Sequence, residues 1–144
     1  MFGEAIILGY TMIALTTVIH TAGILSLFAM LKYVGVTTIA SLSYVRMTRT
    51  LIVTILLIAL FHTVEIWAWA LLYLLLGQFE SFERALYFST VTFTTLGYGD
   101  IVLQQRWQLL SSIEAVNGII LFGVSTAVVF EVFRKLINLA GVFK

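Results

Sequence analysis

The sequence predicts an all-α membrane protein with three transmembrane helices, one shorter helix and a non-helical loop. Of its 144 residues, 61% are hydrophobic and 10% are charged, whereas a soluble domain carries about a quarter charged residues. Three apolar runs are long enough to cross a bilayer, and a shorter fourth run leads into a glycine-rich heptapeptide. The length suits a single domain, so these segments are expected to pack as one unit.

The first element is the apolar run at residues 5–31. A hydrocarbon core about 30 Å thick requires roughly 20 helical residues, so this run can span the membrane. Glu4 precedes the run where a cleaved signal peptide would carry basic residues, so we expect a retained helix. Residues 1–47 are therefore predicted to comprise an extra N-terminal transmembrane helix and a cytoplasmic linker, and the moderately polar residues 33–50 suit a short interfacial helix.

The remaining elements lie within residues 48–138, which precede a short cytoplasmic tail at residues 139–144. Two further transmembrane helices are predicted at residues 51–77 and 108–138. The apolar segment at residues 82–94 is too short to cross the bilayer. We therefore expect a re-entrant half-helix there. The chain would enter the membrane through this helix and return to the same side through the loop that follows it.

The basic residues predict the orientation of the chain. They lie between the first two runs and at the C-terminal end of the chain: Lys32, Arg46, Arg49, Arg134, Lys135 and Lys144. Because basic loops stay in the cytoplasm, the N-terminus is expected outside the cell membrane and the C-terminus in the cytoplasm. Arg46 and Arg49 have voltage-sensor spacing, but two arginines at a membrane boundary are better explained as anchors, so weak voltage dependence is expected.

The heptapeptide TTLGYGD, Thr94 to Asp100, is a polar, glycine-rich stretch between two long apolar runs. Irregular backbone cannot face lipid, because its N–H and C=O groups would lack partners, so this segment should line a path that contains water. Gly97 and Gly99 tolerate positive φ and alternate with bulkier residues. Successive carbonyls can then point the same way and replace the water shell of a cation.

This heptapeptide resembles the filter signature of the potassium-channel family, T-[V/I/L]-G-Y-G-D. The order of helix, pore helix, filter at residues 95–99 and inner helix over residues 48–138 is similar to the pore module of that family. The stretch NGIILFGVSTA resembles its inner helix, with the hinge glycine at Gly118. The resemblance implies a tetrameric potassium-channel pore architecture, with the first transmembrane helix as an addition.

The same resemblance implies a function and the residues that perform it. A homotetramer in the lipid bilayer would conduct potassium ions passively, and its filter would bind them through four backbone carbonyls and one hydroxyl. The residues concerned are Thr95, Leu96, Gly97 and Tyr98, with the hydroxyl of Thr95. Gly99 would close the outer mouth, and the half-helix would aim its partially negative C-terminal end at a central cavity.

A departure from the family pattern at one position of the pore helix predicts a different network behind the filter. Phe88 stands where many relatives have a tryptophan that braces the filter tyrosine, and phenylalanine cannot donate a hydrogen bond. Thr92 is the candidate to brace Tyr98 instead. Tyr87 is expected to donate a hydrogen bond to Asp100 from behind the filter. These changes bear on inactivation more than on the identity of the ion.

Several residues in the last run have two possible roles. Gly118 is either the bending point of the helix or a site of close packing between helices. Phe122, Thr126 and Phe130 recur at a spacing of four, so they share one helix face. That face either lines the cavity and the inner gate, with Phe130 as a hydrophobic constriction, or packs against neighbouring helices.

Four ionisable residues lie well inside the predicted transmembrane runs, away from their ends. Counting from the outer ends places His20 and His62 at similar depths, with Glu65 one helical turn from His62. They form either a proton-sensing or metal-binding cluster or an interhelical contact that docks the first helix. Glu114 is expected either to form hydrogen bonds behind the pore helix or to attract cations from a distance.

Other functional classes are less consistent with the sequence. A secondary transporter usually has repeated halves with paired broken helices. This chain has a single re-entrant segment and no repeated half. An enzyme is not expected, because the only candidate catalytic cluster is His20, His62 and Glu65. A net charge of +1 gives no indication of a nucleic-acid partner. The remaining alternative is a weakly selective or non-selective cation channel on the same scaffold. Leu96 stands where valine is commoner, but its side chain is expected to point away from the ion path and to change packing rather than selectivity.

Overall fold

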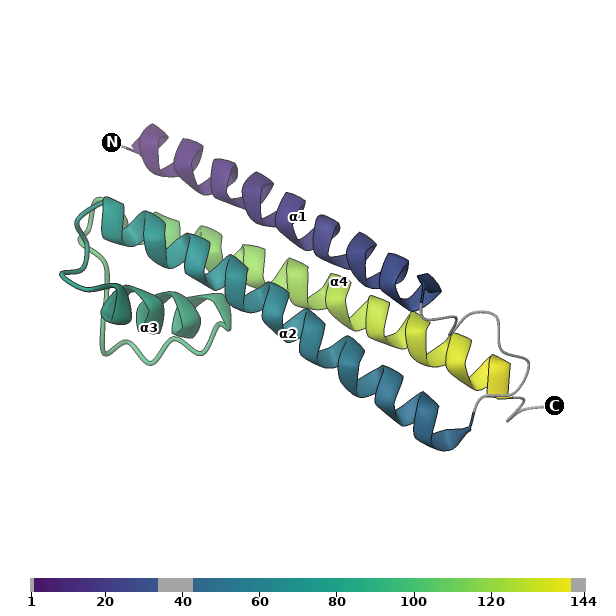
Figure 1. The fold of residues 1–144 in the computed structure, drawn as a ribbon. Helices are drawn as coiled ribbons and strands as arrows, with labels where there is room; N and C mark the ends of the chain where they lie inside the picture. Colours follow the sequence, from purple (N-terminus) through teal and green to yellow (C-terminus); the bar gives the residue numbers. More distant parts are fainter. Residues whose placement is uncertain (1, 34–42, 141–144) are drawn as a thin grey trace.

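The computed structural model describes residues 2–33 and 43–140. These residues form the long helices α1 (Phe2–Tyr33), α2 (Tyr44–Leu75) and α4 (Gln108–Ala140), and the short helix α3 (Phe82–Phe93). Helix α2 runs antiparallel to α1 and α4, and α3 lies beside α2 near one end of the bundle (Figure 1). The three long helices are long and apolar enough to cross a membrane, which confirms the predicted all-helical fold class and its three membrane-spanning candidates.

Helix α2 begins at Tyr44 rather than at the expected residue 51, because Ser43 caps it. The Ser43 hydroxyl accepts a hydrogen bond from the Arg46 backbone N–H at 3.4 Å, which satisfies one of the free donors at the helix start. The second part of the expected interfacial linker is therefore part of α2. The rest of that linker, residues 34–42, lies outside the described residues.

Helix α4 extends to Ala140, slightly beyond the expected end at residue 138. The predicted tail at residues 139–144 therefore begins within a helix. Residues 141–144 lie outside the described residues. The start of α4 at Gln108 is the position expected from the sequence.

Helix α3 contains 12 residues and begins at a serine cap like that of α2. The Ser81 hydroxyl accepts a hydrogen bond from the Arg84 backbone N–H at 3.4 Å. At about 1.5 Å per residue the helix is much shorter than the membrane core. Its buried side chains, Ala85, Phe88, Ser89 and Phe93, face α2 and α4, and this packing fixes where the following segment starts.

An aromatic cluster attaches α3 to α2. The ring of Phe88 lies 5.1 Å from the ring of Tyr73, in an edge-to-face arrangement, and 5.3 Å from the ring of Phe79. Tyr73 and the neighbouring Trp69 are fully buried. Such aromatic pairs contribute about 0.5–1.5 kcal/mol each beyond the area they bury. The cluster therefore holds the C-terminal half of α2 against α3.

Helix α1 packs closely against both α2 and α4. A Cβ added to Gly9 would lie 2.6 Å from Ile113 of α4, and one added to Gly23 would lie 2.7 Å from the ring of Phe61 of α2. The buried side chain of Asn117 also donates a hydrogen bond to the hydroxyl of Thr16 at 2.8 Å. Small residues at these contacts let helix backbones approach, so α1 is an integral part of the fold.

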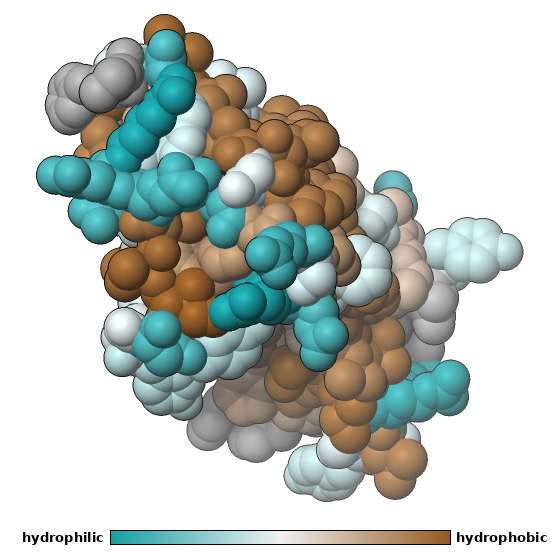
Figure 2. Space-filling view, turned by 90° about the vertical axis from the view of Figure 1, so that its left-hand side faces the viewer, coloured by the Kyte–Doolittle hydropathy of each residue, from teal (hydrophilic) through white to brown (hydrophobic). Residues whose placement is uncertain are grey.

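Apart from the buried Glu65 and Glu114, the charged residues gather at the two ends of the bundle. One end carries Lys32, Arg46, Arg49, Arg134 and Lys135, because α1 and α4 finish there and α2 begins there (Figure 1). The opposite end carries the 76–107 region and the start of α1. Figure 2 looks onto this second end, where hydrophilic side chains lie among hydrophobic ones. Between the ends, the long helices expose mainly apolar side chains.

Candidate functional site

The segment from Thr94 to Asp100 leaves the end of α3 and runs back toward the end of the bundle where α3 began (Figure 1). Its backbone has positive φ at every second residue: 59° at Thr95, 53° at Gly97 and 74° at Gly99. Two of these positions are glycines, for which such a conformation carries no steric penalty. We call this stretch the 94–100 segment.

Hydrogen bonds anchor the start of the 94–100 segment to the last turn of α3. The Val91 carbonyl accepts from the backbone N–H groups of Leu96, at 3.0 Å, and Gly97, at 3.2 Å, and the Thr92 carbonyl accepts from Thr95 N–H at 2.9 Å. These amides therefore point back toward the helix. Their direction leaves the carbonyls of the segment free of partners within α3.

Thr95 is the strained residue of the segment. A β-branched residue at positive φ is a true outlier, and such a conformation costs on the order of 1–3 kcal/mol. Strain of this kind persists where surrounding structure imposes it and tends to mark functional positions. All residues from Thr94 to Asp100 are exposed in the single chain, so the segment presents its backbone on the surface.

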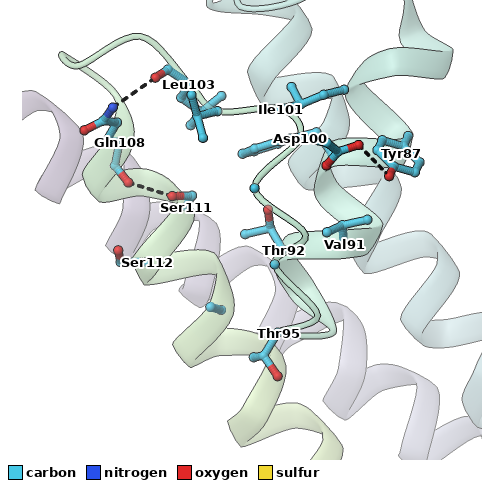
Figure 3. A pocket seen from close by; sticks show the side chains of 15 residues that line it. Tyr87, Val91, Thr92, Thr95, Asp100, Ile101, Leu103, Gln108, Ser111 and Ser112 are labelled. Atoms are coloured by element: carbon cyan, nitrogen blue, oxygen red, sulfur yellow. Dashed lines mark hydrogen bonds between the residues drawn. The ribbon is translucent and has the colours of Figure 1, made fainter.

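A groove of about 460 Å³ separates the 94–100 segment and α3 from the first turns of α4. Figure 3 shows Asp100 and Tyr87 on one wall of this groove, with Gln108, Ser111 and Ser112 of α4 on the other. The Tyr87 hydroxyl donates to Asp100 Oδ2 at 2.8 Å. This hydrogen bond raises the pKa of the Tyr87 phenol above its usual value, so the phenol remains a donor at neutral pH.

The hydrogen bond from Tyr87 to Asp100 is the pairing expected from the sequence, whereas no bond joins Thr92 to Tyr98 among the described residues. Instead, Thr92 contributes its backbone carbonyl to the amide of Thr95. Tyr98 is 67% exposed in the single chain. The role of Thr92 in bracing Tyr98 stays a prediction.

Glu114 of α4 is fully buried behind α3 and has partners on two other helices. Its Oε2 accepts a hydrogen bond from the Tyr73 hydroxyl of α2 at 2.6 Å, and its Oε1 lies 2.5 Å from the Ser89 hydroxyl of α3. The Ser89 hydroxyl also lies 2.9 Å from the Ile66 carbonyl. Of the two roles considered for Glu114, this geometry corresponds to hydrogen bonding behind the short helix.

The contact between Gly118 of α4 and the end of α3 leaves no space for a side chain. A Cβ added to Gly118 would overlap the backbone carbonyl oxygen of Phe93. A backbone atom cannot swing aside as the tip of a side chain can. Close packing therefore accounts for the glycine, and the hinge role stays a prediction.

The buried cluster of His20, His62 and Glu65 joins α1 to α2, and Ser125 connects it to α4. His20 Nδ1 lies 2.7 Å from Glu65 Oε1, and His62 Nδ1 lies 2.9 Å from Glu65 Oε2. The other ring nitrogens both approach the hydroxyl of Ser125 of α4, at 2.9 Å from His62 Nε2 and 3.3 Å from His20 Nε2. Among the described residues, these three side chains form a group that could hold a metal ion, because each offers one ligand atom and these atoms lie within 4.8 Å of one another.

The helix face with Phe122, Thr126 and Phe130 borders an apolar groove between α2 and α4 of about 600 Å³. The ring of Phe122 lies 4.5 Å from His62, while Phe130 is 64% exposed. The groove therefore reaches from the exposed face of α4 to the histidine cluster. Whether Phe130 narrows a pore depends on further copies of the chain, so the gate stays a prediction.

Comparison with known proteins assigns the chain to a protein family. A family model described as "Ion channel" matches residues 59–135, which is more than half of the chain. The protein belongs to this ion channel family. No curated protein and no solved structure matches the chain.

The ion channel match coincides with the site described above. It begins within α2, includes α3 and the 94–100 segment, and ends within α4. The three apolar helices together with this match make the chain a membrane protein with a channel function. Helix α1 precedes the matched residues, so it is an addition to the ion channel domain in this chain.

Sequence reasoning missed several residues of these buried networks. Tyr73, Ser89, Asn117 and Ser125 had not been singled out, although each bonds to an expected residue or to α1. A signal for them existed, because a carboxylate within a membrane requires a local partner. Which tyrosine and which serines supply that partner depends on how the helices face one another.

Proposed function

We propose that the protein is the subunit of a homotetrameric channel that conducts potassium ions passively through the 94–100 segment. The observation that carries the proposal is the alternation of positive φ at Thr95, Gly97 and Gly99 in a GYG stretch that follows a short helix. This conformation suits a ribbon whose carbonyls converge on an ion. The carbonyls of Thr95 to Tyr98 would bind dehydrated potassium, as in carbonyl-lined filters.

The position of the ribbon supports its role as a re-entrant filter. Helix α3 is too short to span a bilayer, and the chain returns toward the end from which α3 started (Figure 1). Irregular backbone at membrane depth requires protein or water beside it. The partially negative C-terminal end of α3 lies within the bundle, where it favours a cation.

The tetramer is proposed because one chain supplies one strand of oxygens, whereas a ring of four such loops surrounds the ion. The whole 94–100 segment is exposed in a single chain, and copies around a common axis would enclose it. The inner helix also exposes large apolar side chains: Val116, Ile119, Ile120, Phe122, Val124, Phe130 and Phe133. Neighbouring copies and lipid would cover them.

The proposed orientation places the basic end of the bundle in the cytoplasm. Five basic residues of the described chain gather at that end, and basic flanks remain cytoplasmic. The N-terminus and the 94–100 segment would then face outside the cell membrane. In this proposed orientation the filter would lie at the outer side, where the chain would enter and leave the membrane again.

A flux assay on the full chain in liposomes tests this proposal. We expect potassium flux to exceed sodium flux strongly in the wild-type protein. Gly97→Ala should abolish flux, because an alanine in the left-handed region costs about 1–2 kcal/mol and each subunit would carry the change. Gly123→Ala is the matched control, since a Cβ there meets nothing within 4 Å.

Equal flux of potassium and sodium through the wild-type protein would replace the proposal with the non-selective alternative on the same scaffold. Unchanged selectivity in Gly97→Ala would remove the 94–100 segment from the conduction path. A stoichiometry other than four chains, measured by the mass of the solubilised assembly, would contradict the tetramer.

A further inference from the structure

Four polar side chains in the middle of the bundle form a closed ring of contacts. Glu65 faces Nδ1 of both histidines, through one carboxylate oxygen each, and Ser125 faces Nε2 of both. The ring therefore passes from Glu65 through His20 to Ser125 and back through His62. Its four members are 0–7% exposed. We call this arrangement the His–Glu–Ser ring.

The number of protons in the ring determines how many of its contacts are hydrogen bonds. Each of the four contacts requires one proton between its two heavy atoms. With an ionised carboxylate and two neutral imidazoles, the histidines supply one proton each and the serine hydroxyl supplies one. This gives three protons for four contacts, so one contact would bring two lone pairs together. One additional proton completes the ring.

The net charge of the ring favours the same state. Without the additional proton the ring carries one negative charge, and with it the ring is neutral whether the proton resides on Glu65 or on an imidazole. A second additional proton would give a positive charge and place two donors in one contact. An isolated charge within a membrane is costly, so the neutral, fully bonded ring has the lowest energy.

We propose that the His–Glu–Ser ring is a binding site for a single proton, which joins α1 and α2 to the inner helix α4. His20 comes from α1, His62 and Glu65 from α2, and Ser125 from α4. Loss of the proton leaves a negative charge and one repulsive contact among these three helices. The proton thereby couples the additional helix α1 to the helix that is proposed to line the pore.

The surroundings of the ring contain no competing charge among the described residues. Helix α3 contributes the apolar ring of Phe93, 6.1 Å from His62. The nearest ionisable residue of α4, Glu131, is six positions from Ser125, or about 9 Å along the helix at 1.5 Å per residue. The groove lined by His62 and Ser125 provides a route by which protons reach the ring.

The melting temperature of the full-length protein in detergent, measured against pH, tests the proposal. In the wild type we expect a loss of stability as the pH rises from neutral, since the folded ring binds one more proton than the unfolded chain. Glu65→Gln should abolish this loss. A glutamine amide donates to one imidazole and accepts from the other, so it completes the ring with neutral histidines and no additional proton.

Two further variants separate proton binding from a merely structural contact. Ser125→Ala removes two contacts and leaves the two that neutral histidines satisfy. It should therefore lower the melting temperature and reduce its alkaline dependence, of which only the part due to the buried charge of Glu65 remains. Thr63→Val is the control, because the exposed Thr63 hydroxyl bonds only to its own helix, at the Ala59 carbonyl. It should retain the full alkaline loss seen in the wild type.

An alkaline loss in Glu65→Gln equal to that of the wild type would overturn the proposal. So would a melting temperature that rises with added Zn²⁺ and falls with a chelator at fixed pH, because the ring would then be a metal site. Neither measurement involves ion flux. Failure of the proton site is therefore distinguishable from failure of the proposed potassium channel.

Discussion

Gly118 of α4 lies directly against the Phe93 carbonyl that ends α3, with no space for a methyl group between them. This contact fixes the depth at which the inner helix crosses the start of the 94–100 segment. The glycine is thus required by a backbone neighbour, independently of any bending of α4.

We predict that Gly118→Ala destabilises the protein, although alanine is the better helix former by about 1 kcal/mol. Overpacking of this kind costs about 1–3 kcal/mol, and here the obstacle is backbone. Gly123→Ala, in the same helix but with open space around it, should be neutral or stabilising. Melting temperatures of the two variants provide the comparison, and an equal or higher value for Gly118→Ala would contradict the packing explanation.

The network around Glu114 predicts a large difference between two substitutions. Ser89 has one proton but two acceptors near it, Glu114 Oε1 and the Ile66 carbonyl. A protonated carboxyl group at Glu114 lets all three contacts of the network form, and a glutamine does the same. Glu114→Gln should therefore retain stability. Glu114→Ala should lose about 1–3 kcal/mol for each buried polar group left without a partner.

Denaturation of both Glu114 variants in detergent distinguishes these outcomes. Tyr73→Phe is a useful companion, because it removes one hydroxyl and retains the ring that packs on Phe88. We expect its effect to lie between those of the two Glu114 variants. A severe loss in Glu114→Gln would mean that the network requires an ionised carboxylate.

Removal of the hydrogen bond from Tyr87 to Asp100 should affect conduction more than stability. The bond lies at the exposed end of the segment, so Tyr87→Phe should leave the melting temperature unchanged. It should shorten the conducting state in electrical recordings, because Asp100 loses the contact that ties it to α3. Tyr10→Phe, at an exposed position of α1, is the control and should behave as wild type.

The same bond has a defined pH dependence. The pKa of Tyr87 is raised by its bond to Asp100, so the bond is present below the ordinary pKa of a phenol. It is lost only as the pH rises through the raised value. Electrical recordings of the wild-type protein should therefore show no pH dependence in the neutral range that can be traced to this bond. A pH dependence in that range that is present in the wild type and absent in Tyr87→Phe would contradict this assignment.

The attachment of α1 should depend on its glycines. Gly9→Leu and Gly23→Leu introduce side chains where Ile113 and Phe61 already lie, so each should destabilise the protein by about 1–3 kcal/mol. Gly3→Leu is the control, because a Cβ there meets nothing within 4 Å. Equal stability of all three variants would show that α1 does not pack as described.

The long helices were predictable from the sequence because length and hydropathy alone determine which segments cross a bilayer. The start of α2 was not, since the cap at Ser43 lies beyond the apolar run and adds a polar first turn with Arg46 and Arg49. Depth counting placed His20 and His62 together, and their rings lie 5.2 Å apart. This works because helical rise is constant.

The lateral partners could not be predicted in the same way. Ser125 meets both histidines, and Tyr73 meets Glu114 across 41 positions of the chain. Such contacts depend on the rotation of each helix about its axis, which a run of uniformly apolar residues does not specify. The positive φ of Thr95 was missed for a different reason, because β-branched residues disfavour it and the surrounding chain imposes it.

The reversal potential of currents through the purified protein, with potassium on one side of a planar bilayer and sodium on the other, tests the central claim most directly. If the 94–100 segment is a carbonyl filter for potassium, the reversal potential should lie far from zero, with the sign of a potassium-selective current. Gly123→Ala should retain that value. A reversal potential near zero in currents of the wild-type protein would contradict the account.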